Sequence, residues 1–169
     1  MVSIRDAIED DAEAITSIYN AMLETTTREW TDTPHTVDEV RAWLGSRQAG
    51  GWPAFVAVDD GNNEVVGWAT YGDFRDSVRW PGYRFTVEHS IHVREDHWGR
   101  GVGRRLLGAL EDHARRAGKH VMVAGIDSEN VESIRFHERL GFVEVARMPE
   151  VGLKFDRRLD LVLMQRILH

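Results

Sequence analysis

The feature that most constrains the fold of this chain is a glycine-rich segment, HWGRGVG, at residues 97–103. An alternating segment, Val87 to Val93, precedes it, and an amphipathic run, Arg104 to Gly118, follows it. This order predicts a strand, a tight turn and a helix. Glycines let a backbone turn tightly and approach a ligand closely, and the free amides at a helix start favour an anion. The segment therefore predicts a loop that binds phosphate.

The glycine loop alone also fits a tight helix entry without a ligand. Three cations, Arg100, Arg104 and Arg105, favour the phosphate interpretation, because cations at a helix start oppose the dipole unless an anion lies between them. The loop lacks the Gly-Lys-Ser/Thr ending of a Walker loop, and it does not fit the usual dinucleotide fingerprint. A different phosphorylated ligand is expected.

Charge and composition exclude several classes of function. The 169 residues predict a single domain, residues 1–169, with an ordinary apolar fraction of 42%. A net charge of −7 argues against nucleic acid as a partner. Cysteine is absent, which excludes disulfides and thiolate chemistry. We find no signal peptide, and no apolar run approaches the ~18 residues of a membrane span, so we expect a cytoplasmic protein with no membrane partner.

The remaining periodicity predicts a mixed α/β domain with the element order β-α-α-β-β-β-α-β-α-β-β. A capping box, Thr36 with Glu39, begins the second helix, and Gly118 ends the third. The expected strands are Val2–Ala7, Ala54–Val58, Glu64–Tyr71, Phe85–Val93, His120–Ile126, Phe142–Met148 and Leu159–Leu168. The expected helices begin at Asp10, at Thr36, at Gly103 (to Ala117) and at Asp127 or Ser128 (to Gly141).

Glu88 is a candidate general base. By strand alternation it shares one face with Ser90 and His92, while the opposite face of the strand, which includes Ile91, is expected to be core. A carboxylate in an apolar strand costs free energy unless it is paired or functional, and burial raises its pKa toward the range of a general base. A structural salt bridge to Arg75 or Arg84 explains the same pattern equally well.

A helix near the C-terminus aligns Asn130, Ser133 and His137 along one face. His137 is a candidate catalytic residue, although a histidine on such a helix is more often a packing residue. Asn130 is near the helix start, where asparagine commonly caps.

Other candidates are weaker. His89 and His92 point to opposite faces of one strand, which argues against a metal site, and no strained G-x-S-x-G turn surrounds Ser90. The loop Gly72–Gly82 carries aromatic and guanidinium groups that suit ligand binding, but a surface loop with a hydrophobic plug also fits.

Several segments together resemble the GCN5-related N-acetyltransferase (GNAT) superfamily. These are the strand and glycine loop, and Asn130 followed by His137-Glu138-Arg139-Leu140-Gly141-Phe142. Three longer segments, YRFTVEHSIHV, HVMVAGIDSEN and HERLGFVEVARMPEVGLKF, resemble its phosphinothricin and methionine sulfoximine acetyltransferase branch. The resemblance covers essentially the whole chain and implies a mixed, mostly antiparallel central sheet flanked by helices.

The resemblance also implies the ligands and the residues that bind them. Acetyl-CoA would be the donor, and the amine of a small amino-acid-like molecule the acceptor. Glu88 matches the general base, and His137 stands where many members have a tyrosine that protonates the departing thiolate, although solvent can also do this. The expected cofactor-binding residues are Ile91, His92, Val93, Gly99, Arg100, Gly101, Val102, Gly103, Arg104 and Asn130. Arg75 and Arg84 would bind the substrate carboxylate, with Trp30 and Phe74 as pocket walls.

One position departs from the family pattern. The loop usually opens with Arg or Gln, and here Trp98 stands there, so Arg100 or Arg104 is expected to supply the missing pyrophosphate contact. The branch also implies a homodimer, with Met148 to Phe155 near a shared site. Two alternatives stay open: acetylation of another amine (a protein N-terminus, a polyamine or an aminoglycoside) and a CoA-binding module without turnover. The paired arginines disfavour polycationic acceptors.

Overall fold

A seven-stranded sheet with the strand order β1-β2-β3-β4-β5-β7-β6 organises the chain in the computed structural model, which describes residues 1–169. Every neighbouring pair is antiparallel except β4 with β5. The strands are β1 (Val2–Asp6), β2 (Ala54–Asp59), β3 (Val65–Asp73), β4 (Thr86–Val93), β5 (Val121–Asp127), β6 (Val143–Lys154) and β7 (Arg157–Ile167). The helices are α1 (Ala12–Asn20), α2 (Val37–Ala49), α3 (Val102–Arg116) and α4 (Val131–Arg139). The predicted element order and the mostly antiparallel sheet are confirmed.

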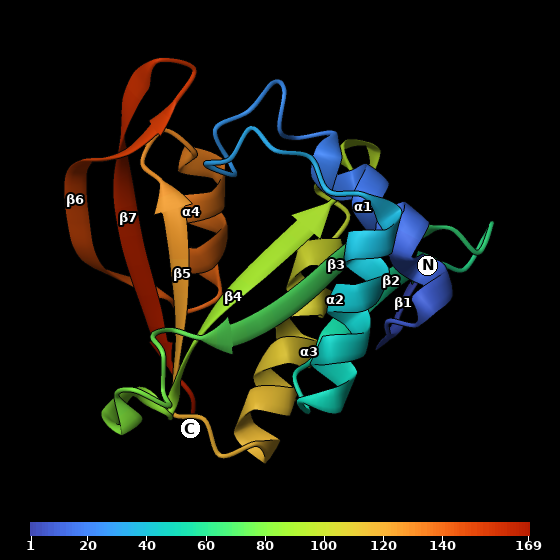
Figure 1. Cartoon of the computed structure of the whole chain (residues 1–169), viewed down its shortest axis with the longest axis horizontal. Helices are drawn as coiled ribbons and strands as arrows, with labels where there is room; N and C mark the ends of the chain where they lie inside the picture. The colour runs from blue at the N-terminus through green and yellow to red at the C-terminus, as the bar shows by residue number, and fades with distance from the viewer.

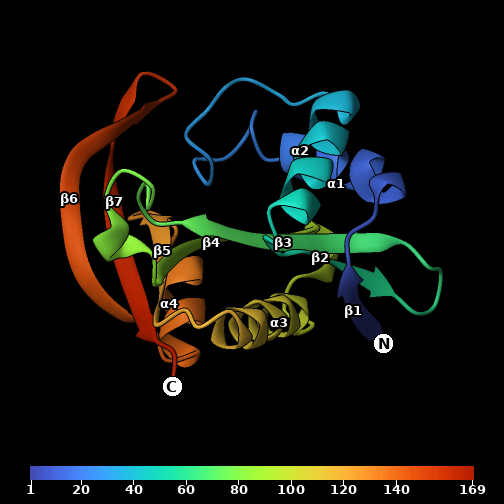
Figure 2. The ribbon, with the colours of Figure 1, turned by 60° about the horizontal axis from the view of Figure 1, so that its bottom comes forward.

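Helices cover both faces of the sheet (Figure 2). Helices α1 and α2 lie on one face, where Ile15, Leu44 and Trp68 belong to the smaller of two buried clusters. Helices α3 and α4 lie on the other face, where α3 inserts Leu106 and Leu110 into the larger cluster. Strands β2 and β3, which lie between these two layers, are therefore buried along most of their length.

Local sequence signals place most of the helix ends. Thr36 Oγ1 accepts from the Glu39 amide at 3.2 Å and Glu39 Oε2 accepts from the Thr36 amide at 2.8 Å, which confirms the capping box. Gly118, with φ of +69°, follows the end of α3. Two expectations were wrong. A short 3₁₀ turn, Glu9–Asp11, precedes α1, so Asp11 rather than Asp10 is its N-cap.

The second wrong boundary is the start of α4. Asp127 still belongs to β5, and the helix begins only after Asn130, whose Oδ1 accepts from the Ser133 amide at 3.2 Å. The capping interpretation of Asn130 is thereby confirmed.

The last two strands are also longer than predicted, because irregular pairing between Met148 and Gly152 lets β6 continue to Lys154.

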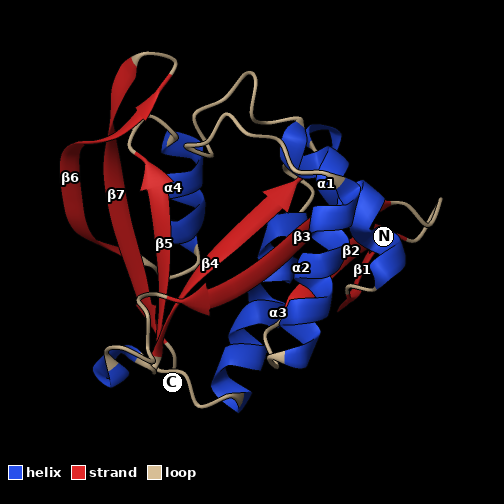
Figure 3. Cartoon of the chain, viewed as in Figure 1, coloured by secondary structure: helices blue, strands red, loops and turns tan.

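The central strands β4 and β5 separate after a short parallel contact. Pairing joins Thr86–Glu88 of β4 to Val121–Val123 of β5, and beyond that both strands continue unpaired with each other (Figures 1 and 3). β4 remains paired with β3 up to Val93, and β5 remains paired with β7 along its whole length. The sheet thus stays continuous at its base and opens between its two middle strands.

None of the helices combines the length and the apolar character that a membrane crossing requires.

Candidate functional site

A cleft of about 990 Å³ lies where β4 and β5 part. Its walls come from β4, the glycine loop, the first turn of α3, the end of β5 and the inner face of α4, and the connection between α1 and α2 adds Met22, Arg28 and Glu29. All of the predicted cofactor-binding residues line this cleft except Arg100, which is exposed beside it. The structure therefore brings together segments that are far apart in the sequence, from Met22 after α1 to Leu140 at the end of α4.

The direction of the main chain along β4 decides which of its groups face the cleft. Arg94 N donates to Val66 O, and Thr86 O accepts from Phe74 N, so even-numbered residues direct their main-chain polar groups at β3. The amides and carbonyls of Ile91 and Val93 therefore face the open side. His92, one of the expected cofactor-binding residues, directs its main-chain groups at β3 instead, so it reaches the cleft through its side chain.

The glycine loop presents free amides to the cleft. Gly99 and Gly101 have φ of +71° and +79°, a left-handed conformation that side chains with a Cβ rarely adopt. Gly101 is the N-cap of α3, and the first intrahelical hydrogen bond runs from Arg105 N to Gly101 O at 3.2 Å. The amides of residues 102–104 consequently have no helical acceptor. Together with the helix dipole, such free amides favour an anionic ligand.

His97 anchors the start of this loop. Its buried ring lies between two carboxylates, with Nε2 3.2 Å from Asp59 Oδ2 and Nδ1 2.9 Å from Asp96 Oδ1. Asp59 ends strand β2, so the histidine ties the loop to the sheet. Nothing in the motif itself indicates this anchoring role of His97.

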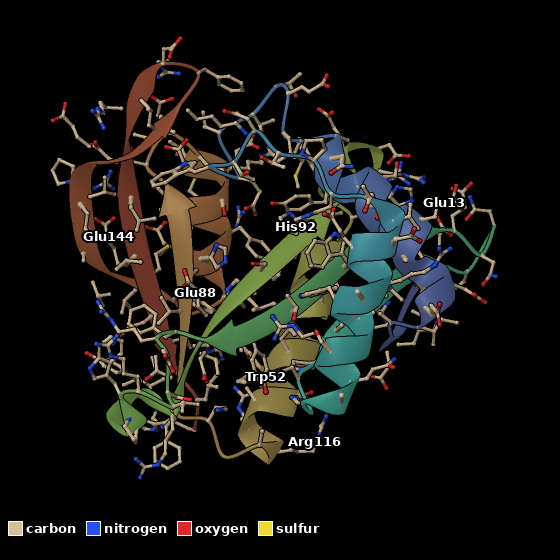
Figure 4. All side chains as sticks on the ribbon, in the orientation of Figure 1. Glu13, Trp52, Glu88, His92, Arg116 and Glu144 are labelled. Carbon is tan, nitrogen blue, oxygen red and sulfur yellow. The ribbon has the colours of Figure 1, made fainter.

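Glu88 lies between β4 and β5 near the base of the opening (Figure 4). Its Oε1 comes within 2.8 Å of the point that a Cβ at Gly125 would occupy, so glycine at that position makes room for the carboxylate. The salt-bridge interpretation is not supported, because the Arg84 guanidinium donates to Pro81 O at 2.8 Å and Arg75 stacks on Phe74 and Tyr83. Burial without a cation partner raises the pKa of Glu88.

His137 packs inside the cleft as one of a pair of stacked imidazoles. Its ring centroid lies 5.2 Å from that of His89, at an interplanar angle of 19°. His137 Nδ1 is 2.7 Å from Ser133 O, so Nδ1 carries the hydrogen and Nε2 is left without a partner. Burial lowers the pKa of His137 and lowers that of His89 to about 3, so both rings are neutral at pH 7.

The connection between α1 and α2 contributes residues that sequence reasoning missed. Glu29 Oε1 lies 3.4 Å from His92 Nε2 without making a hydrogen bond, and burial raises the pKa of Glu29. The segment has no hydrophobic periodicity that would have indicated its path. Its position is set by distant contacts: Thr27 Oγ1 donates to Asp127 Oδ2, and Lys154 Nζ donates to Glu29 O.

The predicted acceptor residues lie outside the cleft wall. Phe74, Arg75 and Arg84 belong to the connection between β3 and β4. This connection enters β4 at its first residue, at the end of the strand opposite to the glycine loop (Figure 1). Trp30 packs over Gly152 of β6, where any Cβ would overlap the indole ring. No group of three or more His, Asp or Glu side chains is placed to hold a metal ion.

The arrangement fits a long nucleotide thioester. Free amides at the start of α3 suit a diphosphate, and the open edge of β4 suits an extended arm that pairs like a strand. Three histidines of the cleft, His89, His92 and His137, have buried ring nitrogens without a hydrogen-bond partner. A fold with this opening and this loop defines a class of acyl-CoA-dependent transferase.

Comparison with known proteins confirms the class. A family model described as the acetyltransferase (GNAT) family matches residues 15–142. The chain therefore belongs to the GNAT family of acetyltransferases, and it is an N-acetyltransferase that uses acetyl-CoA.

Individual relatives place it within the family. An L-methionine sulfoximine/L-methionine sulfone acetyltransferase of Salmonella typhimurium is 49% identical over 97% of this chain and 93% of its own length. An L-amino acid N-acyltransferase of Escherichia coli is 48% identical, covering 97% and 92%. A phosphinothricin N-acetyltransferase of Streptomyces coelicolor is 34% identical, covering 98% and 95%. The predicted branch is confirmed.

A solved structure gives the same result for the fold. A putative acetyltransferase from Salmonella typhimurium, determined with its cofactor acetyl-CoA, superposes with a TM-score of 0.93 at 47% identity, covering 100% of this chain and 95% of that one.

Replacing Gly101 tests the glycine loop. Gly101→Ala forces a Cβ into the left-handed region at a cost of about 1–2 kcal/mol, so the loop amides turn away from the ligand. We expect the Kd for CoA, measured by calorimetry, to rise about tenfold or more. Gly108→Ala is the matched control, because Gly108 lies within α3 with nothing within 4 Å of its added Cβ. An unchanged Kd in Gly101→Ala contradicts the phosphate assignment.

Proposed function

We propose that this protein transfers the acetyl group of acetyl-CoA to the α-amino group of a small amino acid or analogue, such as methionine sulfoximine, methionine sulfone or phosphinothricin. The names of the three relatives support this acceptor class. The observation that carries the proposal is the position of Glu88: a carboxylate with a raised pKa and no cation partner, at the base of the opening beside Gly125.

The chemistry assigns Glu88 as the general base. An amino acid arrives as an ammonium, and only the neutral amine attacks a thioester. Glu88 accepts the ammonium proton, directly or through a water molecule, and its raised pKa brings it closer to the operating pH. Acetyl-CoA supplies an activated acetyl group. The Ile91 amide, which faces the open edge of β4, is the donor best directed to polarise the thioester oxygen.

His137 is proposed to act at the thiolate through Nε2. Because Nδ1–H is committed to Ser133 O, Nε2 carries the free lone pair of the neutral ring. The side chain can therefore donate from Nε2 only after it takes up a proton, and the lowered pKa of His137 keeps that form scarce at neutral pH. Solvent remains the alternative donor to the thiolate.

Arg75 and Arg84 are proposed to bind the carboxylate of the acceptor, with Phe74 and Trp30 beside its side chain. Glu88 pairs in register with Gly72, two residues before Phe74, so the connection that carries both arginines begins next to the proposed base. A guanidinium matches a carboxylate bidentately, and the Arg75 guanidinium is not engaged by any carboxylate.

An acceptor panel tests the function. Thiol release from acetyl-CoA is measured with L-amino acids, methionine sulfone, methionine sulfoximine, phosphinothricin, a polyamine and an aminoglycoside. We expect turnover with the amino-acid analogues, because they combine one amine with one carboxylate. Turnover with the polyamine or the aminoglycoside alone would refute the acceptor class, and no turnover with any member would favour a binding module.

Glu88→Gln tests the base. The variant keeps the size of the side chain and loses the proton acceptor, so kcat should fall by about 10²–10⁴-fold, while the Kd for CoA stays unchanged. In the unaltered protein kcat/KM rises with pH as Glu88 ionises, and this limb is absent from the variant. A variant with the same rate and the same pH profile would remove Glu88 from the mechanism.

We further propose a homodimer formed through β6. This strand is at the edge of the sheet (Figure 1). It exposes the side chains of Val145, Met148, Val151 and Leu153. An exposed apolar edge strand favours unspecific association with other chains. Symmetric packing against the same strand of a second copy would bury these side chains.

Sedimentation equilibrium measures the mass of the particle. We expect twice the chain mass of 19.3 kDa, and Leu153→Glu should shift the equilibrium to the monomer, because it places a charge in the apolar contact. Val78→Glu, at an exposed site outside β6, is the control. A monomer at every concentration would refute the dimer.

The cytoplasmic location and the absence of nucleic-acid and membrane partners stay predictions.

A further inference from the structure

An arginine and a tryptophan from distant parts of the chain stack at the edge of the cleft. The Arg28 guanidinium carbon lies 4.2 Å from the centroid of the Trp98 ring. Arg28 belongs to the connection between α1 and α2, whereas Trp98 directly precedes Gly99 of the glycine loop. Both side chains line the cleft.

The Trp98 ring is held in place from its other end. Its Nε1 donates to Val93 O at 2.7 Å, the last main-chain acceptor of β4 on the open side. Trp98 is 40% exposed, and the hydrogen bond orients its ring as a flat surface between the strand and the loop. A guanidinium that stacks on this surface loses side-chain freedom before any ligand arrives.

The charge of Arg28 has no counter-ion in the chain. Its guanidinium makes no salt bridge or hydrogen bond, although a guanidinium carries five N–H donors. The charge nonetheless acts inside the cleft: burial first, and the Arg28 charge second, lower the pKa of His92 to about 4. A fixed, unneutralised cation at the wall of a cleft favours an anionic ligand group there.

We propose that Arg28, held on Trp98, is a cofactor-binding residue that donates to phosphate oxygens of acetyl-CoA from the side opposite to α3. The free amides of residues 102–104 and the Arg104 side chain approach the cleft from one wall, and Arg28 approaches it from the α1–α2 connection. The planar donors of arginine match phosphate oxygens bidentately. Trp98 itself offers no cation, so the stacked Arg28 supplies a positive charge at this one position of the loop, in addition to Arg104.

This inference rests on the proposed phosphate role of the glycine loop, and Arg28→Ala tests it separately. We expect KM for acetyl-CoA and Kd for CoA to rise roughly tenfold, the size of one lost charge-assisted contact. Because Arg28 is assigned to the cofactor alone, kcat and KM for the acceptor should stay within about twofold of the unaltered protein. Arg28→Lys keeps the charge and should recover part of the affinity.

Arg41→Ala is the matched control. Arg41 is an exposed arginine of α2 that pairs with Asp38 and lies outside the cleft, so its removal changes the net charge equally. We expect no change in KM for acetyl-CoA from this control.

Two ligands distinguish which phosphate Arg28 contacts. With CoA and with 3′-dephospho-CoA, the effect of Arg28→Ala is measured by calorimetry. An effect that persists with both places Arg28 at the diphosphate, and an effect that disappears with 3′-dephospho-CoA places it at the 3′-phosphate. Either result supports the proposal.

A compensating variant provides the sharpest test. Arg28→Ala combined with Trp98→Arg moves the cation onto the loop and should restore affinity for CoA. An unchanged Kd in Arg28→Ala, alongside a weakened Kd in Gly101→Ala, would overturn the proposal and leave the loop assignment intact. An equal rise of KM for acceptor and acetyl-CoA, with a lower Tm, would also overturn it, because the stack would then only anchor the connection.

Discussion

The parting of β4 from β5 is the constraint on which the rest of the structure depends. Three residues of parallel pairing hold the sheet together, and beyond them each strand is kept extended by its outer neighbour alone. The amides that the missing ladder leaves unpaired face the cleft, where a strand-like ligand arm can replace them. Glu88, the last residue of β4 that pairs with β5, marks the point where the closed sheet opens into the cleft.

Electrostatics divide this opening into two regions. At the glycine loop, free amides, the dipole of α3 and two arginine side chains favour negative charge. Away from the loop, burial keeps the rings of His89 and His137 neutral and raises the pKa of Glu88 at the base. The division matches a cofactor that is anionic at one end and uncharged at its reacting end.

Periodicity and capping predicted the elements well because those signals are local. The apolar spacing of α3 and the capping box at Thr36 each depend on residues within one or two turns. The face shared by Glu88, Ser90 and His92 also followed from strand alternation. The start of α4 was predicted too early, because Asp127 completes the pairing of β5 with β7 and only Asn130 is free to cap.

The α1–α2 connection could not be predicted, since nothing in its own sequence fixes its path. Arg28 and Glu29 reach the cleft only because Asp127 and Lys154, about a hundred or more positions later, hold the segment there. The backbone direction of His92 was missed for a related reason: strand alternation places side chains, but the partner strand decides where the amides point. The predicted acceptor residues lie on an irregular connection that periodicity does not describe.

The contact between Trp30 and Gly152 has a consequence for how the family can diversify. Because no side chain fits at residue 152 beneath the indole, any substitution there shifts Trp30, and Arg28 lies only two positions earlier on the same stretch. Under the proposed roles, Trp30 contacts the acceptor and Arg28 contacts acetyl-CoA, so a change in the C-terminal hairpin would alter the binding of both substrates. Amine selectivity and coenzyme affinity would then change together, and changing one alone would require a second substitution that uncouples Trp30 from residue 152.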